Sequence, residues 1–416
     1  MVNVLLTAFS NATIPLNRLL AWADFAVHYV SGYFLYFLVG GYEPQFHTRP
    51  ALGKGYSPSV LVTGASQGIG LATSLYLASK GYTVFASVKD EQELQLIKHE
   101  IKSRDLPSNV SIRPLIMDVL SSSSIASAVS EVSSAVHGNS KTPFVGVINN
   151  AGFCMISPME LTPDKAVRDL FELDFWAYIS VVKAFLPIIK EYQGRFINVG
   201  SYGGFVNPPM WVPYSAAKAA IEGMTRSWRF ELKPFGVGMT SVRPGWTRYV
   251  SHYPNPRHHN RLSRNALSFY FLSFFLTLTC RTHGIGPKIT RAWDGYWNHV
   301  KEGYVPAGVD SLGHVVDTDK SCGEREKQVY GPMMSKWQGL VLAAADGAAQ
   351  TAEAVATTVY DAMTDPFLQP YYTVGYDALI GQTVRDLVPE SIYEVGMARL
   401  FESKITERVL SPYTPS

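Results

Sequence analysis

The sequence has few cysteines and no long run of basic residues. Only three cysteines occur among 416 residues, and none belongs to a CxxC pair. That count excludes a disulfide-stapled scaffold and a cysteine-based zinc site, and it fits a reducing compartment. We expect no metal centre, because His252, His258 and His259 lie in a proline-rich stretch without carboxylates at ligand spacing. A formal net charge of +2 without a basic run argues against nucleic-acid binding.

Charged side chains are also missing from one stretch near the amino terminus. Residues 25–42 contain no Lys, Arg, Asp or Glu, and Trp22, Tyr29 and Tyr42 bring aromatic rings to this part of the chain. A helix needs about 20 apolar residues, with a lower limit of about 17, to cross a bilayer, and aromatic residues favour the membrane interface. We therefore expect residues 1–56 to hold an apolar helical membrane anchor and a linker. A helical hairpin packed on the protein itself is the alternative.

From residue 57 onward, strand-like and helix-like segments alternate. The strand-like segments are residues 59–63, 83–88, 112–117, 144–148, 195–199 and 238–242. The helix-like segments are residues 71–80, 91–103, 122–136, 163–191 and 213–233. This alternation predicts an α/β fold with a doubly wound parallel sheet, helices on both faces, and a ligand site at the carboxyl ends of the strands.

The alternation stops after residue 250. Residues 266–280 are free of charge but too few to span a bilayer comfortably, so we expect a buried or interfacial helix there. A helix over about 348–363 and a strand over 371–374 follow, and then an amphipathic tail. The prediction is one domain over residues 57–416, in which residues 251–345 form a long insertion after the sixth strand.

A glycine-rich turn, TGASQGIG, lies between the first strand and the first helix. Glycines permit a tight turn and a close approach to a pyrophosphate, which the free N–H groups at the helix start then bind. The residues expected to contact a dinucleotide there are Thr63, Gly64, Ser66, Gln67, Gly68, Ile69 and Gly70.

Later strand ends carry further candidates for cofactor contacts. Asp118 and Val119 follow the third strand, in a position to meet an adenine ring. The fourth strand ends in Asn150, Ala151 and Gly152, whose small or amide-bearing side chains allow a cofactor to lie close to the backbone. We favour a cofactor contact for Asn150 over a simple turn role.

Tyr214 and Lys218 are the strongest candidates for chemistry. Four residues apart, they share one face of a predicted helix. An ammonium group beside a phenol favours the phenolate, so we expect Lys218 to lower the pKa of Tyr214 toward the working pH. Ser201 follows the fifth strand, thirteen residues before Tyr214.

The order TGxxxGxG, NNAG, Ser, YxxxK and Pro244-Gly245 resembles the short-chain dehydrogenase/reductase family over about residues 57–250. The tail from Tyr371 to Ala378, with residues 387–389, resembles the branch that contains retinol and 17β-hydroxysteroid dehydrogenases. The resemblance implies a Rossmann fold and an oxidoreductase that acts on CH–OH groups with NAD(P)+ as acceptor.

The resemblance also implies residue roles. Tyr214 would be the general acid, Lys218 would hold the nicotinamide ribose, and Ser201 would stabilise the reacting oxygen. Asp174 stands where the family has an Asn, so a catalytic relay and a simple structural role both stay open.

The turn after the sixth strand carries the last implied cofactor contacts. Pro244, Gly245 and Thr247 would lie beside the nicotinamide. Tyr249 departs from the Thr that usually follows this turn, which leaves the carboxamide contact open.

The end of the second strand bears on the choice of cofactor. An acidic residue at the position of Val88 would bind the 2′-hydroxyl of NAD, whereas Lys89 offers a positive charge to a 2′-phosphate. We therefore favour NADP(H) over NAD(H), although Asp90 follows directly.

Together these features predict interconversion of a carbonyl and an alcohol on a small hydrophobic substrate, such as a lipid, steroid or retinoid, beneath an apolar lid. We expect membrane association, at the endoplasmic reticulum with the catalytic domain facing the cytosol, and a homodimer by analogy with the family. One alternative is a catalytically silent NADP(H)-binding protein in a membrane assembly. The other is a soluble enzyme that acts on small polar carbonyls.

Overall fold

The computed structural model describes the part of the chain that carries the predicted alternation. The described residues are 57–104, 106–107, 110–137, 142–248, 350–365 and 368–394, with short strands at 304–305, 308–309, 315–317 and 320–321. The expected anchor at 25–42, the apolar segment 266–280 and Tyr249 lie outside this part. No helix among the described residues is long and apolar enough to cross a membrane.

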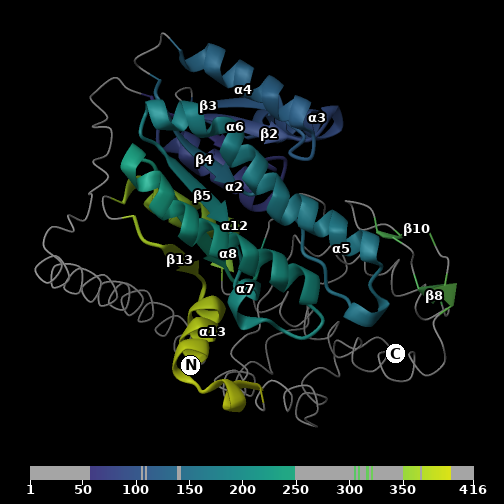
Figure 1. Cartoon of the computed structure of the whole chain (residues 1–416). Helices are drawn as coiled ribbons and strands as arrows, with labels where there is room; N and C mark the ends of the chain where they lie inside the picture. The colour runs from purple at the N-terminus through teal and green to yellow at the C-terminus, as the bar shows by residue number, and fades with distance from the viewer. Residues whose placement is uncertain are drawn as a thin grey trace, which may run out of the picture. The chain divides into compact units, whose positions relative to one another are not determined.

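A seven-stranded sheet forms the centre of the described structure (Figure 1). In sheet order its strands are β13 (Tyr371–Val374), β6 (Gly238–Pro244), β5 (Arg195–Val199), β4 (Phe144–Asn149), β1 (Ser59–Val62), β2 (Thr83–Val88) and β3 (Ser111–Ile116). Every neighbouring pair is parallel, which confirms the predicted sheet. The order reverses between β1 and β4, and the crevice at such a point is where parallel sheets bind ligands.

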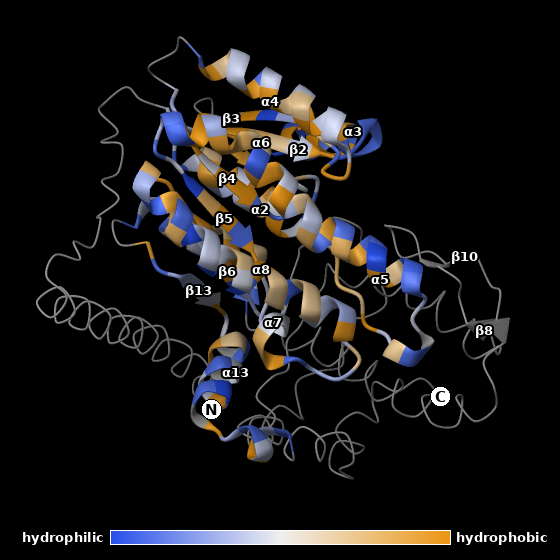
Figure 2. Ribbon diagram, in the orientation of Figure 1, coloured by the Kyte–Doolittle hydropathy of each residue, from blue (hydrophilic) through white to orange (hydrophobic). Residues whose placement is uncertain are grey.

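Helices cover both faces of the sheet. One face packs on α2 (Gly68–Ser79), α3 (Glu91–Lys102) and α12 (Ala352–Thr364). The other packs on α4 (Ser122–Val136), α6 (Ala177–Glu191) and α8 (Val212–Leu232). The central strands are coloured mainly hydrophobic in Figure 2, as expected for strands buried on both faces.

The predicted helix over residues 163–191 contains a π-helical turn. The chain forms α5 (Asp164–Phe171), then a π-helical turn, η2 (Glu172–Trp176), and then α6. A π turn holds one more residue than an α-helical turn, and such turns occur often at functional sites. The predicted long helical stretch is confirmed over residues 164–191, but the sequence did not predict this π turn, which carries Asp174.

Two short strands join distant parts of the chain. β7 (Thr247–Arg248) pairs in parallel with β12 (Gln350–Thr351), and Gln350 Nε2 donates a hydrogen bond of 3.2 Å to Thr247 Oγ1. The helix predicted from about residue 348 begins at Ala352, because the Thr351 side chain caps it by accepting a bond from the Ala354 N–H.

The remaining described elements are short or lie near the carboxyl end. They are η1 (Met159–Leu161), α7 (Gly203–Val206), η3 (Lys233–Phe235), β8 (Tyr304–Val305), β9 (Gly308–Val309), β10 (Val315–Asp317), β11 (Lys320–Ser321) and α13 (Tyr376–Leu387). β9 pairs with β10 and β8 with β11, both antiparallel.

Candidate active site

The glycine-rich turn after β1 has the backbone conformation that its sequence predicts. Gly64 and Gly68 both adopt positive φ, +63° and +59°, a conformation that residues with a Cβ atom rarely adopt. Gln67 precedes α2 but makes no side-chain hydrogen bond to the helix start. The first N–H groups of α2 therefore lack a side-chain cap, which is the chemistry that a phosphate would satisfy.

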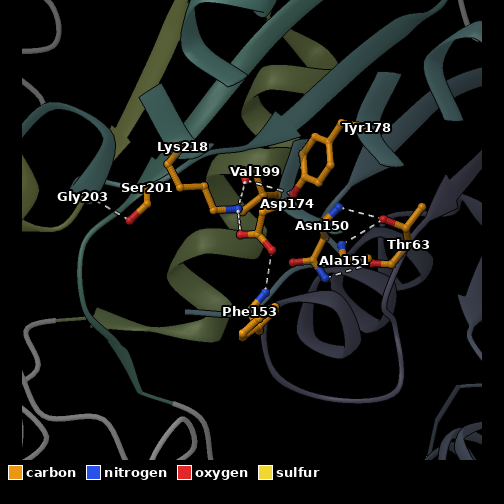
Figure 3. Close-up of polar contacts among 10 residues, drawn as sticks. All are labelled: Thr63, Asn150, Ala151, Phe153, Asp174, Tyr178, Val199, Ser201, Gly203 and Lys218. Carbon is orange, nitrogen blue, oxygen red and sulfur yellow. Dashed lines mark hydrogen bonds and ion pairs between the residues drawn. The ribbon is translucent and has the colours of Figure 1, made fainter. Parts of the chain in front are cut away.

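Asn150 and Thr63 tie this turn to the end of β4 (Figure 3). Thr63 Oγ1 accepts the N–H groups of Asn150 and Ala151 at 2.9 and 3.0 Å, and Asn150 Nδ2 donates to the carbonyls of Thr63 and Gly64 at 2.9 and 3.2 Å. The Asn150 amide N–H groups are thus engaged with the turn itself. Asn150 fixes the shape of the turn, and a direct cofactor contact stays a prediction.

Lys89 and Asp90 lie at the end of β2. Asp90 caps α3 by accepting the Glu93 N–H at 2.9 Å, and its other oxygen lies 3.8 Å from Lys89 Nζ. Both side chains are partly exposed, so solvent weakens their mutual attraction. Val88, at the position where an acidic residue would bind a ribose hydroxyl, is buried. The lysine charge is thus offset only in part.

Asp118 organises the turn after β3. Its carboxylate accepts the Leu120 N–H at 3.0 Å, and its own N–H donates to Ser124 Oγ at 3.0 Å. Val119 beside it is buried. This part of the predicted adenine site therefore lies at the carboxyl end of β3, the edge strand next to β2.

The catalytic candidates converge from three elements (Figure 3). Lys218 of α8 places Nζ 3.0 Å from Asp174 Oδ2 of the π turn and 3.4 Å from the carbonyl of Val199 at the end of β5. Asp174 Oδ1 accepts the Phe153 N–H at 2.9 Å. Lys218 and Asp174 are both buried, so this ion pair is shielded from water.

Electrostatics in this cluster follow from burial and from the ion pair. Asp174 raises the pKa of Lys218 against the opposing effect of burial, and burial raises the pKa of Asp174 against the effect of Lys218. Tyr178, one helical turn after Asp174, donates from its hydroxyl to the Val199 carbonyl at 3.1 Å. Burial raises the pKa of Tyr178 to about 12, so this ring serves as a neutral neighbour of Lys218.

Tyr214 lies beside Lys218, as the sequence predicts, but its pKa is not lowered overall. Lys218 Nζ lies 5.6 Å from the centre of the Tyr214 ring. Lys218 and a hydrogen bond with Ser201 lower the pKa of Tyr214, but desolvation, Cys154 and Asp174 raise it, and desolvation is the largest effect. The net result is a raised pKa. The expected net lowering is therefore wrong for the protein alone.

Ser201 lies between the Pro-Gly turn and Tyr214. Its hydroxyl accepts the Gly203 N–H at 3.1 Å, and the N–H of Tyr202 donates to the Pro244 carbonyl at 3.0 Å. Ser201 is thus held near the end of β6 through its neighbour Tyr202.

The Pro-Gly turn itself is held from the carboxyl-terminal part of the chain. The Gly245 N–H donates to the Val374 carbonyl at 2.8 Å, and the Trp246 N–H donates to Asp377 Oδ2 at 2.7 Å. Thr247 Oγ1 donates to the Gly245 carbonyl at 3.0 Å.

An aromatic cluster packs beside the Pro-Gly turn and Tyr214. Tyr202, Trp211 and Trp246 pack with ring centroids 5.1 to 6.2 Å apart, and Trp211 also contacts Tyr214 at 5.6 Å. Sequence reasoning missed this cluster. It also missed Tyr178, although the spacing of four from Asp174 was a readable signal. Within the described residues no group of His, Cys, Asp and Glu could hold a metal ion.

Comparison with known proteins agrees with this geometry. The sequence profile of the family described as short chain dehydrogenase matches residues 58–256. Uncharacterized oxidoreductase YusZ of Bacillus subtilis is 30% identical over 200 residues, which cover 46% of this chain and 68% of that protein. The chain belongs to the short-chain dehydrogenase family. The predicted family is therefore confirmed.

Two mammalian relatives share the same segment. D-beta-hydroxybutyrate dehydrogenase of Mus musculus is 29% identical over 189 residues, 45% of this chain and 53% of that protein. Estradiol 17-beta-dehydrogenase 2 of Mus musculus is 34% identical over 191 residues, 45% of this chain and 47% of that protein. The chain thus matches about half the length of each.

A solved short-chain dehydrogenase from Streptomyces avermitilis has the same fold, with a TM-score of 0.52 and 20% identity over 85% of this chain and 98% of that one.

Proposed function

We propose that this short-chain dehydrogenase interconverts a carbonyl and an alcohol on a hydrophobic substrate, with NADP(H) as the cofactor and Tyr214 as the general acid and base. The observation that carries the proposal is the meeting of Ser201, Tyr214 and Lys218 at the carboxyl end of the parallel sheet, the same edge at which β1 leads into the uncapped start of α2.

Each residue of the site would have a separate role in the reaction. A bound nicotinamide cofactor supplies or accepts the hydride at the substrate carbon. Tyr214 gives its hydroxyl proton to the carbonyl oxygen during reduction and takes it back during oxidation. Ser201, which hydrogen-bonds Tyr214, donates to the same substrate oxygen and stabilises its developing charge. Lys218, held by Asp174 and the Val199 carbonyl, would bind the ribose hydroxyls.

The phosphate end of the cofactor would lie next to β1, across the point between β1 and β4 where the strand order reverses. The turn between Thr63 and Gly70 and the first N–H groups of α2 would hold the pyrophosphate. Lys89 would pair with a 2′-phosphate, and Val88 offers nothing to a free 2′-hydroxyl. The partial exposure of Lys89 supports this role, because a bulky anion needs access to it.

A hydrophobic substrate is supported by the aromatic cluster of Tyr202, Trp211 and Trp246 next to Tyr214 and by the steroid named for one relative. The hydroxybutyrate named for the other relative favours the alternative of a small polar substrate. A panel of substrates of both kinds distinguishes the two.

The test is consumption of NADPH by the purified protein against hydrophobic ketones and aldehydes and against acetoacetate, beside Tyr214→Phe. We expect turnover of at least one hydrophobic carbonyl, reduced by at least about 10²-fold in the variant because the proton donor is lost. Turnover confined to acetoacetate would support the polar alternative. Tight NADPH binding without any turnover would support the catalytically silent protein.

A further inference from the structure

The ion pair between Asp174 and Lys218 is buried and tightly held by its surroundings. Asp174 is fully buried, and its two carboxylate oxygens have separate partners, Lys218 Nζ at 3.0 Å and the Phe153 N–H at 2.9 Å. Gly152 packs so closely that a Cβ there would lie 3.0 Å from Asp174 Oδ1. The carboxylate is therefore fixed in place before any ligand binds (Figure 3).

The polar and titratable groups around Lys218 come from five parts of the chain. They are Asp174 of η2, Tyr178 of α6, the Val199 carbonyl of β5, Tyr214 of α8 and Cys154 of the segment after β4. Burial raises the pKa of the Cys154 thiol, and burial likewise keeps Tyr178 neutral. Among these described neighbours, Asp174 is the carboxyl group, and the Lys218 ammonium at 3.0 Å and the Phe153 N–H at 2.9 Å favour its charged form against the effect of burial.

We propose that Asp174 is a positioning residue whose charge offsets that of Lys218. Tyr214 therefore exchanges its proton at a higher pH than it would with an uncharged side chain at position 174. This inference rests on the proposed function of Tyr214.

The effect of Asp174 on the pKa of Tyr214 is electrostatic. A single positive charge within about 4–6 Å of an acid lowers its pKa by about 1 to 3. Lys218 Nζ lies 5.6 Å from the centre of the Tyr214 ring, but the carboxylate of Asp174 lies only 3.0 Å from that Nζ. Tyr214 therefore faces a pair of opposite charges, whose combined field is much weaker than that of a lone ammonium group. Asp174 and Lys218 indeed act in opposite directions on the pKa of Tyr214.

The decisive variant is Asp174→Asn, which keeps the shape of the side chain and removes its charge. With Lys218 no longer offset, the pKa of Tyr214 falls. In alcohol oxidation, where Tyr214 must be deprotonated, the acidic limb of the kcat/KM profile should move down by about one pH unit. In carbonyl reduction, where Tyr214 must be protonated, the alkaline limb should move down by a similar amount. Asp164→Asn, an exposed carboxylate at the start of α5, is the matched control and should leave both limbs in place.

A second measurement reads Tyr214 without turnover. Tyrosinate absorbance is titrated with NADP+ bound, and the same titration of Tyr214→Phe is subtracted. The midpoint for Asp174→Asn should lie below that of the wild type by about one pH unit. If the Asn variant does not fold, as melting shows, Asp174→Ser takes its place, because it also removes the charge.

The outcomes separate the two proposals. A shift in the limbs or in the absorbance midpoint, with melting and NADPH binding preserved, supports the role of Asp174. A lower kcat with both limbs and the midpoint unmoved overturns it and leaves Asp174 a structural residue. Absence of wild-type turnover contradicts the proposed function, while the absorbance titration still decides the inference.

Discussion

Lys89 is the residue on which the choice of cofactor depends. It is partly exposed at the end of β2, and Asp90, 3.8 Å away, is held in the cap of α3. Because a hydrogen bond to a charged group contributes about 1.5–3 kcal/mol, Lys89→Ala should raise the KM for NADPH at least about 10-fold and leave the KM for NADH nearly unchanged. Steady-state kinetics with both cofactors measures this.

Lys98→Ala, an exposed lysine on α3, is the control for a general loss of positive charge. Equal effects of the two substitutions, or an equal effect of Lys89→Ala on both cofactors, would contradict the assignment of Lys89 to the 2′-phosphate.

At the residue scale, the sequence identified most of the groups that meet in the site but not all of their partners. Tyr214 and Lys218 were predictable because four residues along a helix is a local relation. The contact of Lys218 with Asp174 joins α8 to the π turn and needs the folded chain. The raised pKa of Tyr214 was missed because it depends on desolvation, which no spacing of residues reveals.

At the scale of elements, the packing of α2 against the end of β1 requires a glycine at position 70. A Cβ at Gly70 would lie 2.2 Å from the Gly64 carbonyl oxygen and 2.6 Å from Asn150 Nδ2. Gly70→Ala should therefore lower the free energy of unfolding by about 1–3 kcal/mol and weaken NADPH binding, since the turn must move. Thermal melting and a binding titration measure the two effects.

Gly223→Ala is the matched control on α8, because a Cβ there meets nothing within 4 Å. It should raise the free energy of unfolding by about 0.5–1 kcal/mol through helix propensity alone. Similar melting of the two variants would contradict the packing argument.

Asp377 links α13 to the Pro-Gly turn. It is buried, and it accepts the Trp246 N–H at 2.7 Å. Asp377→Ala leaves that N–H buried without this acceptor, so we expect a loss of about 1–3 kcal/mol in stability and a higher KM for the cofactor. Asp386→Ala, exposed on the same helix, should change neither quantity. Unchanged melting of Asp377→Ala would count against the link.

Elements were predicted where the signal is local. The sequence pattern predicted the seven strands of the main sheet to within one residue at most positions, and the five inner strands were the clearest because they are buried on both faces and mainly apolar. The π turn within the long helical stretch was missed. Its sequence, ELDFW, remains helical in pattern, and the turn packs against α8, which is distant in the sequence.

At the scale of the whole molecule, the sequence predicts a membrane-bound protein. The reason is the uncharged stretch 25–42, which lies outside the described residues. We expect the full chain to sediment with membranes, to resist extraction by high salt or alkaline carbonate, and to be released by detergent. Fractionation followed by immunoblotting measures this. Release by salt alone, or recovery in the supernatant without detergent, would contradict the anchor.

The rest of the molecule was less predictable for physical reasons. Alternation of strands and helices indicates a sheet, but residues 251–345 follow no such period, so their prediction as an insertion rests on the loss of pattern. The alternation of strands and helices carries no information on the substrate, on a homodimer or on the host membrane. They stay predictions.

The pairing of β7 with β12 has a consequence for how such a protein can change over time. Thr247 lies opposite Gln350, so the chain leaves β7 after residue 248 and enters β12 at residue 350 beside the same point. A connection of about a dozen residues is enough to join parallel neighbours. The stretch 249–349 therefore begins and ends at one pair of neighbouring strands, so its length can differ between related proteins without moving the ends of β7 and β12 apart.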